Sequence, residues 1–126
     1  MQIEFDGVDQ SDGLIAEAKD EATGLVDDVV TIGNLLTVHG SGLKIEGDEA
    51  NKDIIGLFFE RADGARAKAE IIAVNEPRTL KAIVPGDLGS GNQYRLVIVT
   101  QSSAKHSGTL LKEPRRIQSE FTLAAH

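Results

Sequence analysis

The chain has 126 residues, which is the size of a single domain, and it contains 40% apolar residues, 4% aromatic residues and no cysteine. The lack of cysteine excludes a disulfide framework and a thiolate metal site. With 20 acidic against 13 basic residues the net charge is −7. This balance disfavours nucleic-acid binding, because such binding depends on Lys and Arg to neutralise phosphates.

The chain divides into a short polar start and one folded domain. Residues 1–13 are acidic and polar, so we predict an N-terminal extension or linker there and a domain over 14–126. The start has neither a basic segment nor an apolar core of the kind that marks a signal peptide. No apolar run approaches the ~20 residues that a membrane span needs, so no membrane contact is expected.

The first half of the domain predicts strands joined by polar turns. A strand is expected over 14–19 and an irregular extended segment over 24–33. Within residues 35–45, an alternating strand that carries Leu36 and Val38 runs into Gly40-Ser41-Gly42, where we predict a turn. A second short apolar pair, Leu43 and Ile45, follows the turn. Gly40 and Gly42 are expected to accept positive φ there at little steric cost.

The second half has clearer strand patterns. Asp63-Gly64 lies between two apolar runs, which predicts a β-hairpin. The expected strands are 54–60, 67–74, 80–84 (ended by Pro85), 94–101 and a last one after Pro114 that carries Ile117, Phe121 and Leu123. About seven short strands without a convincing helix predict an all-β, Ig-like β-sandwich of two antiparallel sheets.

The order of these segments resembles a known family. The matching stretches are N-L-L-T-V-H-G-S-G-L-K-I (34–45), I-I-G-L-F-F (54–59), L-K-A-I-V-P (80–85) and L-L-K-E-P-R (110–115). They resemble an Ig-like domain of unknown function that follows HU-like DNA-binding domains in bacterial proteins. The resemblance covers about 14 to 123 and implies that any DNA binding belongs to the HU-like domain, which this chain does not contain.

Two motifs could suggest a catalytic or binding role, but their sequence context favours a structural role for both. Tyr94 begins a regular strand, where Ig-like sandwiches often turn a Tyr hydroxyl back to an upstream backbone group, the tyrosine corner. His39-Gly40-Ser41-Gly42 does not have the spacing of a nucleophile elbow, and a strand follows it. We therefore expect no enzyme and no cofactor.

Acidic loops are weak candidates for calcium. Glu46, Asp48, Glu49 and Asp53 crowd one loop, and Ca²⁺ requires about six to eight converging oxygens. Neither this loop nor Asp6, Asp9 and Asp12 has the EF-hand spacing. A solvated loop is the favoured alternative, so no metal is predicted.

Two features are candidates for partner contacts. One is a basic cluster of Lys112, Arg115 and Arg116, with Lys105 and His106 nearby in the sequence. If these side chains share a rim, they would bind an acidic partner or a nucleic-acid backbone; the alternative is that they lie on the solvent side of an edge strand and discourage edge pairing. We favour the solvent side. Phe58 faces away from Ile55, Leu57 and Phe59, so it is an exposed contact if its side of the strand is solvated and a core residue if both faces are covered; the sequence leaves both open.

These observations predict a non-catalytic interaction or spacer module with a protein partner. By resemblance it is the C-terminal part of a larger bacterial, HU-like DNA-binding protein in the cytoplasm, and the domain alone is not expected to bind nucleic acid. The alternative is an exported accessory domain for carbohydrate or cell-surface protein contacts. The absence of Trp argues against a sugar-binding platform.

Overall fold

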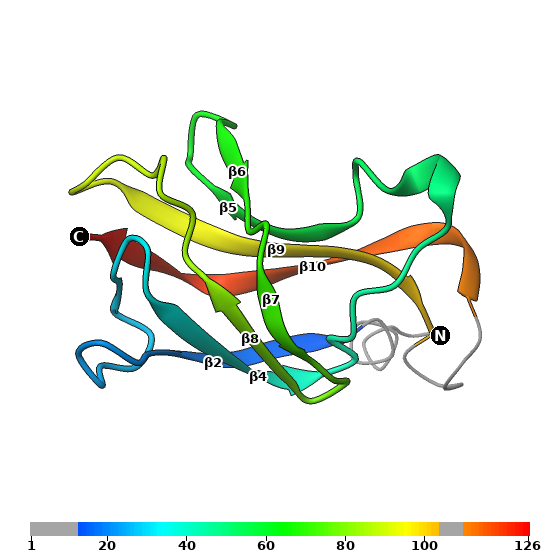
Figure 1. The fold of residues 1–126 in the computed structure, drawn as a ribbon, viewed down its shortest axis with the longest axis horizontal. Coiled ribbons are helices and arrows are strands. Elements are labelled where there is room, and N and C mark those ends of the chain that lie inside the picture. The colour runs from blue at the N-terminus through cyan, green and yellow to red at the C-terminus, as the bar shows by residue number, and fades with distance from the viewer. Residues whose placement is uncertain (1–12, 104–109) are drawn as a thin grey trace, which may run out of the picture.

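The computed structural model describes residues 13–103 and 110–126, in which two β-sheets pack face to face (Figure 1). The first sheet has the strand order β3 (Val29–Val30), β10 (Leu110–Ala125), β9 (Gln93–Ser102), β5 (Gly56–Glu60) and β6 (Arg66–Lys68). The second has the order β2 (Leu14–Asp20), β4 (Leu35–Ser41), β8 (Thr79–Ile83) and β7 (Ile72–Asn75). One 3₁₀ turn, η1 (Glu49–Asn51), is the helical element of the described residues. The predicted all-β sandwich is confirmed.

The core lies between the sheets and follows the alternation of the strands. Leu57 and Phe59 of β5 pair in register with Ile98 and Leu96 of β9, and all four are fully buried. Small aliphatic side chains of the second sheet pack onto them. Each fully buried side chain of this size contributes about 1.5–3 kcal/mol.

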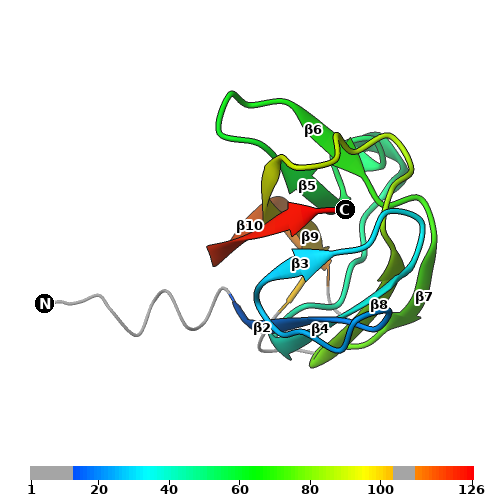
Figure 2. The same cartoon turned by 90° about the vertical axis from the view of Figure 1, so that its left-hand side faces the viewer.

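The prediction of purely antiparallel sheets is wrong at one strand. β3 pairs with β10 in parallel, through Val29↔Ala124 and Val30↔Ala125, and Figure 2 shows it beside β10. The amide of Ile32 continues this pairing by donating to the carbonyl of His126. An apolar pattern specifies which face of a strand is buried but does not specify the direction of its partner.

The predicted strand over 67–74 is two strands that belong to different sheets. β6 forms the expected hairpin with β5, whereas β7 pairs with β8 of the other sheet. The chain crosses between the layers at Ala69, whose amide donates to the carbonyl of Leu57. As a result β6 and β7 are the last strands of their sheets on the same side of the sandwich, opposite the side where β2 contacts β10.

Gly40 is not the turn residue that was predicted. It lies inside β4 without a positive φ, and a Cβ there would come within 1.9 Å of the carbonyl oxygen of Leu14 in β2. The register of β2 against β4 shifts between Ile15 and Glu17, so a bulge brings the two backbones close at this point. Gly42, with φ +64°, is the residue that turns the chain.

The last strand begins earlier than predicted. β10 runs through Pro114, which the sequence placed before the strand. Its register against β9 shifts between Leu110 and Arg115, and such irregularities tolerate a proline because a ladder hydrogen bond is already missing. The predictions for Asp6, Asp9, Asp12, Lys105 and His106 lie outside the described residues. In the part that is described, no helix is long and apolar enough to cross a membrane.

Candidate interaction surfaces

A groove opens where the chain changes sheets, between β6 and the connection that follows β8. Its volume is about 550 Å³. We call it the edge groove; it is lined by Gly33, Arg66, Ala67, Lys68, Glu70, Ile71, Ile83, Val84, Pro85, Gly86 and Asp87. β6, which lines one side of the groove, is the last strand of its sheet and has no partner strand on its outer edge among the described residues. The edge groove is therefore flanked by backbone that an extended segment could pair with.

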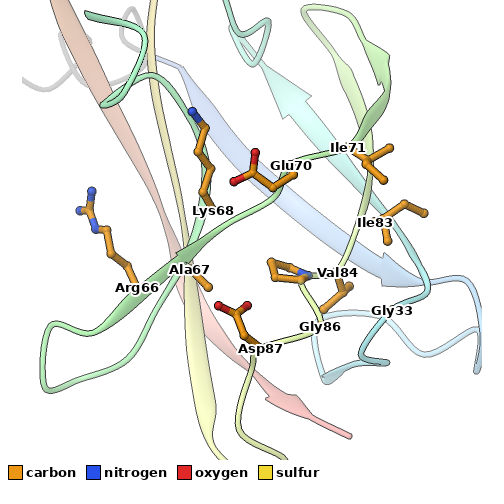
Figure 3. A pocket seen from close by; sticks show the side chains of 11 residues that line it. Gly33, Arg66, Ala67, Lys68, Glu70, Ile71, Ile83, Val84, Gly86 and Asp87 are labelled. Atoms are coloured by element: carbon orange, nitrogen blue, oxygen red, sulfur yellow. The ribbon is translucent and has the colours of Figure 1, made fainter.

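The edge groove has an apolar end and a charged end. Figure 3 shows Ile71 and Ile83 together at one end and Arg66 and Lys68 projecting from β6 at the other. Ile71 is 59% exposed, the largest value among the exposed large apolar side chains of the described residues. Glu70 and Asp87 balance the two cations, so the lining carries no net charge. This lining suits a polypeptide with both apolar and polar side chains.

The outer face of the first sheet carries a cluster of arginines around one carboxylate. Glu60 accepts hydrogen bonds from Arg66 at 2.9 Å and from Arg116 at 3.2 Å. The hydrogen bond from Arg66 holds the pKa of the Glu60 carboxyl below its usual value, and the charge of Arg116 acts in the same direction against the effect of burial. Arg116 belongs to β10 and reaches Glu60 on β5 across the intervening strand β9.

Phe58 is neither an exposed contact nor part of the main core. It points to the outer face, where the Arg66 guanidinium lies 4.7 Å from its ring centroid, and it is only 5% exposed. Val97, its neighbour in the register, is also buried and also lies outside the main core cluster. The Arg66 guanidinium thus covers the Phe58 ring on the outer face, which removes Phe58 as a contact residue.

A smaller cavity lies on this outer face beside the β5–β6 hairpin. We call it the arginine cup; its volume is about 220 Å³, and it is lined by Glu60, Arg61, Ala62, Gly64, Gln93, Arg95 and Thr122. Arg61 is paired with Asp63 at 2.5 Å. Arg95 is exposed and forms no ion pair with any described residue.

The predicted basic cluster is divided by the strand that carries it. Arg116 lies on the outer face, whereas Arg115 points to the opposite side and is half-buried. Arg115 donates to the carbonyl of Ser102 at 2.6 Å, to the carbonyl of Gly42 at 2.7 Å and to the Ser102 hydroxyl at 2.8 Å. The favoured solvent-facing placement is therefore wrong for Arg115, because adjacent residues of a strand face opposite ways. Lys112 is exposed near the start of β10.

The acidic loop is tied to the sheet by its own hydrogen bonds. Asp48 accepts from the amide nitrogen of buried Gln101 at 3.1 Å, and this bond lowers the pKa of Asp48. Glu46 pairs with Lys44, and Glu49 pairs with Lys52. Within the described residues, Asp53 included, no three His, Cys, Asp or Glu side chains gather closely enough to hold a metal ion.

The remaining predicted residues have structural surroundings. The hydroxyl of Tyr94 accepts a hydrogen bond from the amide of Gly89 at 2.8 Å, the arrangement of a tyrosine corner. Asp63 accepts from the amide of Ala65 at 3.0 Å in the hairpin turn, and Gly64 has φ +92°. The Asp63–Ala65 hydrogen bond and the positive φ of Gly64 shape the turn that forms one wall of the arginine cup.

Sequence reasoning missed three residues of these surfaces. Glu60 and Arg95 face each other across β5 and β9, a pairing that depends on strand register. Gln101 lies at the end of an apolar strand, and a polar residue in that position was the available signal for a buried hydrogen-bonding side chain. Its side chain bonds Asp48 and the carbonyl of Leu111.

Comparison with known proteins agrees with this architecture. A family model described as a domain of unknown function (DUF4469) with an Ig-like fold matches residues 14–117. The chain belongs to this family. The DUF4469 chain is also similar to a solved structure from Bacteroides vulgatus that is named, provisionally, a bacterial DNA-binding protein. The TM-score is 0.78 at 28% identity, and the match covers 90% of this chain but 47% of the solved one. No curated protein matches the sequence.

Proposed function

We propose that this DUF4469 chain is a non-catalytic interaction module of a larger, DNA-associated protein, and that it binds an extended polypeptide segment in the edge groove. The observation that carries the proposal is the edge strand β6, which lines that groove and has no partner strand on its outer edge among the described residues. Strand addition to an exposed sheet edge is a recurring mode of peptide recognition.

The link to DNA comes from the solved relative. That protein is named, provisionally, as DNA-binding, and this chain spans about half of its length. The net charge of −7 opposes binding of a polyanion by the module itself, so we assign DNA contact to another part of such a protein.

The lining of the edge groove supports a binding role over a catalytic one. It contains no hydroxyl, thiol or imidazole side chain, and its ionisable side chains are those of Arg66, Lys68, Glu70 and Asp87. His39 lies exposed on β4, which contributes nothing to the lining. The lining also lacks aromatic side chains, which disfavours the alternative of a carbohydrate site.

A peptide-display selection against the folded domain tests the proposal. Enriched peptides should bind the wild type and lose binding to Ile71→Glu, which places a charge at the apolar end of the edge groove. Leu25→Glu is the matched control, because Leu25 is 46% exposed and lies outside the lining. Failure to enrich any peptide, or enrichment of peptides that are indifferent to Ile71→Glu, would count against the edge groove.

A titration with duplex DNA at low salt tests the second part of the proposal. The isolated chain should give no saturable response. A saturable response that weakens with added salt would show that the module itself contacts nucleic acid.

A further inference from the structure

The arginine cup contains one guanidinium, that of Arg95, whose charge no described carboxylate neutralises. Arg61, Arg66 and Arg116 share the two carboxylates of Asp63 and Glu60. Arg95 lines the cup and forms no ion pair with any described residue, although Glu60 is its partner in the β5–β9 register. Because both oxygens of Glu60 are already held by other guanidinium groups, Arg95 retains unused donors.

A second donor accompanies Arg95. Thr122 donates its hydroxyl hydrogen to the Gln93 side-chain oxygen at 3.0 Å, and this bond fixes the orientation of the amide. The amide nitrogen of Gln93 has no hydrogen-bond partner among the residues that the structure describes. The cup therefore combines a free guanidinium with a neighbouring neutral donor.

We infer that the arginine cup binds a single carboxylate group of a polypeptide partner. A guanidinium binds a carboxylate through two parallel hydrogen bonds, and these charge-assisted bonds are the strong ones. The volume of about 220 Å³ is below the 300–1,000 Å³ of drug-sized ligand sites, so one small anionic group fits better than a nucleotide.

The charge of the chain favours a carboxylate over a nucleic acid. A polyanion must approach a molecule with net charge −7, whereas one carboxylate meets only the local field of the arginines. The cup is also separate from the edge groove: the hairpin residues Arg61, Ala62 and Gly64 line the cup, and Arg66, Ala67 and Lys68 line the groove. The inference therefore stands or falls independently of the edge groove.

The test is an NMR titration of the full chain that follows the side-chain Nε–Hε signal of Arg95 and the backbone amide of Gly64. The probes are a blocked peptide amide with one internal Glu, the same peptide with Gln and a free C-terminal carboxylate, inorganic phosphate, and duplex DNA. Saturable shifts with either carboxylate peptide support the inference, and the peptide that binds more tightly identifies a side chain or a chain terminus as the source.

Two variants show whether the binding belongs to the cup. Arg95→Gln should weaken carboxylate binding by about tenfold or more, the loss expected for one charge-assisted pair. Arg78→Gln should leave it unchanged, because Arg78 is also exposed and without an ion pair in the described residues but lines neither cavity. Far-UV circular dichroism checks that both variants fold.

Four results would overturn the inference. They are no saturable shift with any carboxylate probe, equal losses in the two variants, tighter binding of phosphate than of both peptides, and saturable binding of duplex DNA that depends on Arg95. The last two would reassign the cup to phosphate or to nucleic acid.

Discussion

Arg115→Ala is the substitution that most directly tests the packing of the two sheets. The Arg115 side chain donates to Ser102 at the end of β9 and also to the carbonyl of Gly42, which directly follows β4 of the other sheet. Truncation to alanine removes the three hydrogen bonds at once. It leaves two backbone carbonyls and one hydroxyl without this donor in a partly buried site.

The expected loss follows from those bonds. A hydrogen bond to a charged group contributes about 1.5–3 kcal/mol, and bonds that share one side chain are not additive. We therefore expect the free energy of unfolding to fall by about 2–4 kcal/mol. Typical domains have about 5–15 kcal/mol in total, so the variant should still fold. At roughly 4 °C per kcal/mol for a chain of this length, the melting temperature should fall by about 8–16 °C.

Urea unfolding followed by far-UV circular dichroism measures this loss, since the chain has no Trp to report by fluorescence. Arg116→Ala is the control, because this adjacent residue is exposed and forms its ion pair with Glu60 on the opposite face. An exposed pair of this kind contributes about 0–1 kcal/mol. Equal losses in the two variants would refute the inward placement of Arg115.

Three further predictions concern other parts of the sandwich. Gly40→Ala should lower the free energy of unfolding by about 2–4 kcal/mol or prevent folding, because the new Cβ would overlap the β2 backbone. The control Gly86→Ala should be nearly neutral, because Gly86 has open space around it. Similar melting temperatures of the two variants would contradict the bulge. Tyr94→Phe should cost about 1 kcal/mol in urea unfolding through loss of the hydrogen bond from Gly89, and an unchanged midpoint would argue against the tyrosine corner. The pKa of Glu60 is lowered in the folded state, so its contribution to stability is full above the unfolded carboxyl value of about 4.3 and is lost as pH falls through the lower folded value. Urea midpoints of wild type and Glu60→Gln should therefore converge on acidification from about pH 5, and a constant difference would contradict the arginine pairing.

The strand pattern predicted most of the fold. Alternation in 54–60 and 94–101 placed Leu57, Phe59, Leu96 and Ile98 on one buried face, and the structure pairs them. Asp63-Gly64 predicted the β5–β6 hairpin, because few dipeptides fit its turn. These features depend on residues close together in the chain, so one sequence contains enough information to predict them.

The candidate sites were less predictable. Phe58 was identified as facing outward, but its cover is Arg66, which reaches it only when β6 folds back on β5. The edge groove exists because the chain leaves the first sheet after Lys68 and enters the second at Ile72. The segment from 67 to 74, apolar except for Lys68 and Glu70, is compatible with one strand or with two.

The sequence by itself determined a small, acidic, all-β domain without cysteine, because composition and a two-residue period describe each strand and the face it buries. Only the tertiary structure decided that Arg115 joins the sheets, that Gly40 permits a close backbone approach, and that Arg95 lies in a cup without an ion pair to any described residue. The physical reason is that alternation specifies the face of each side chain, whereas register, strand direction and sheet membership determine which residues meet across the fold.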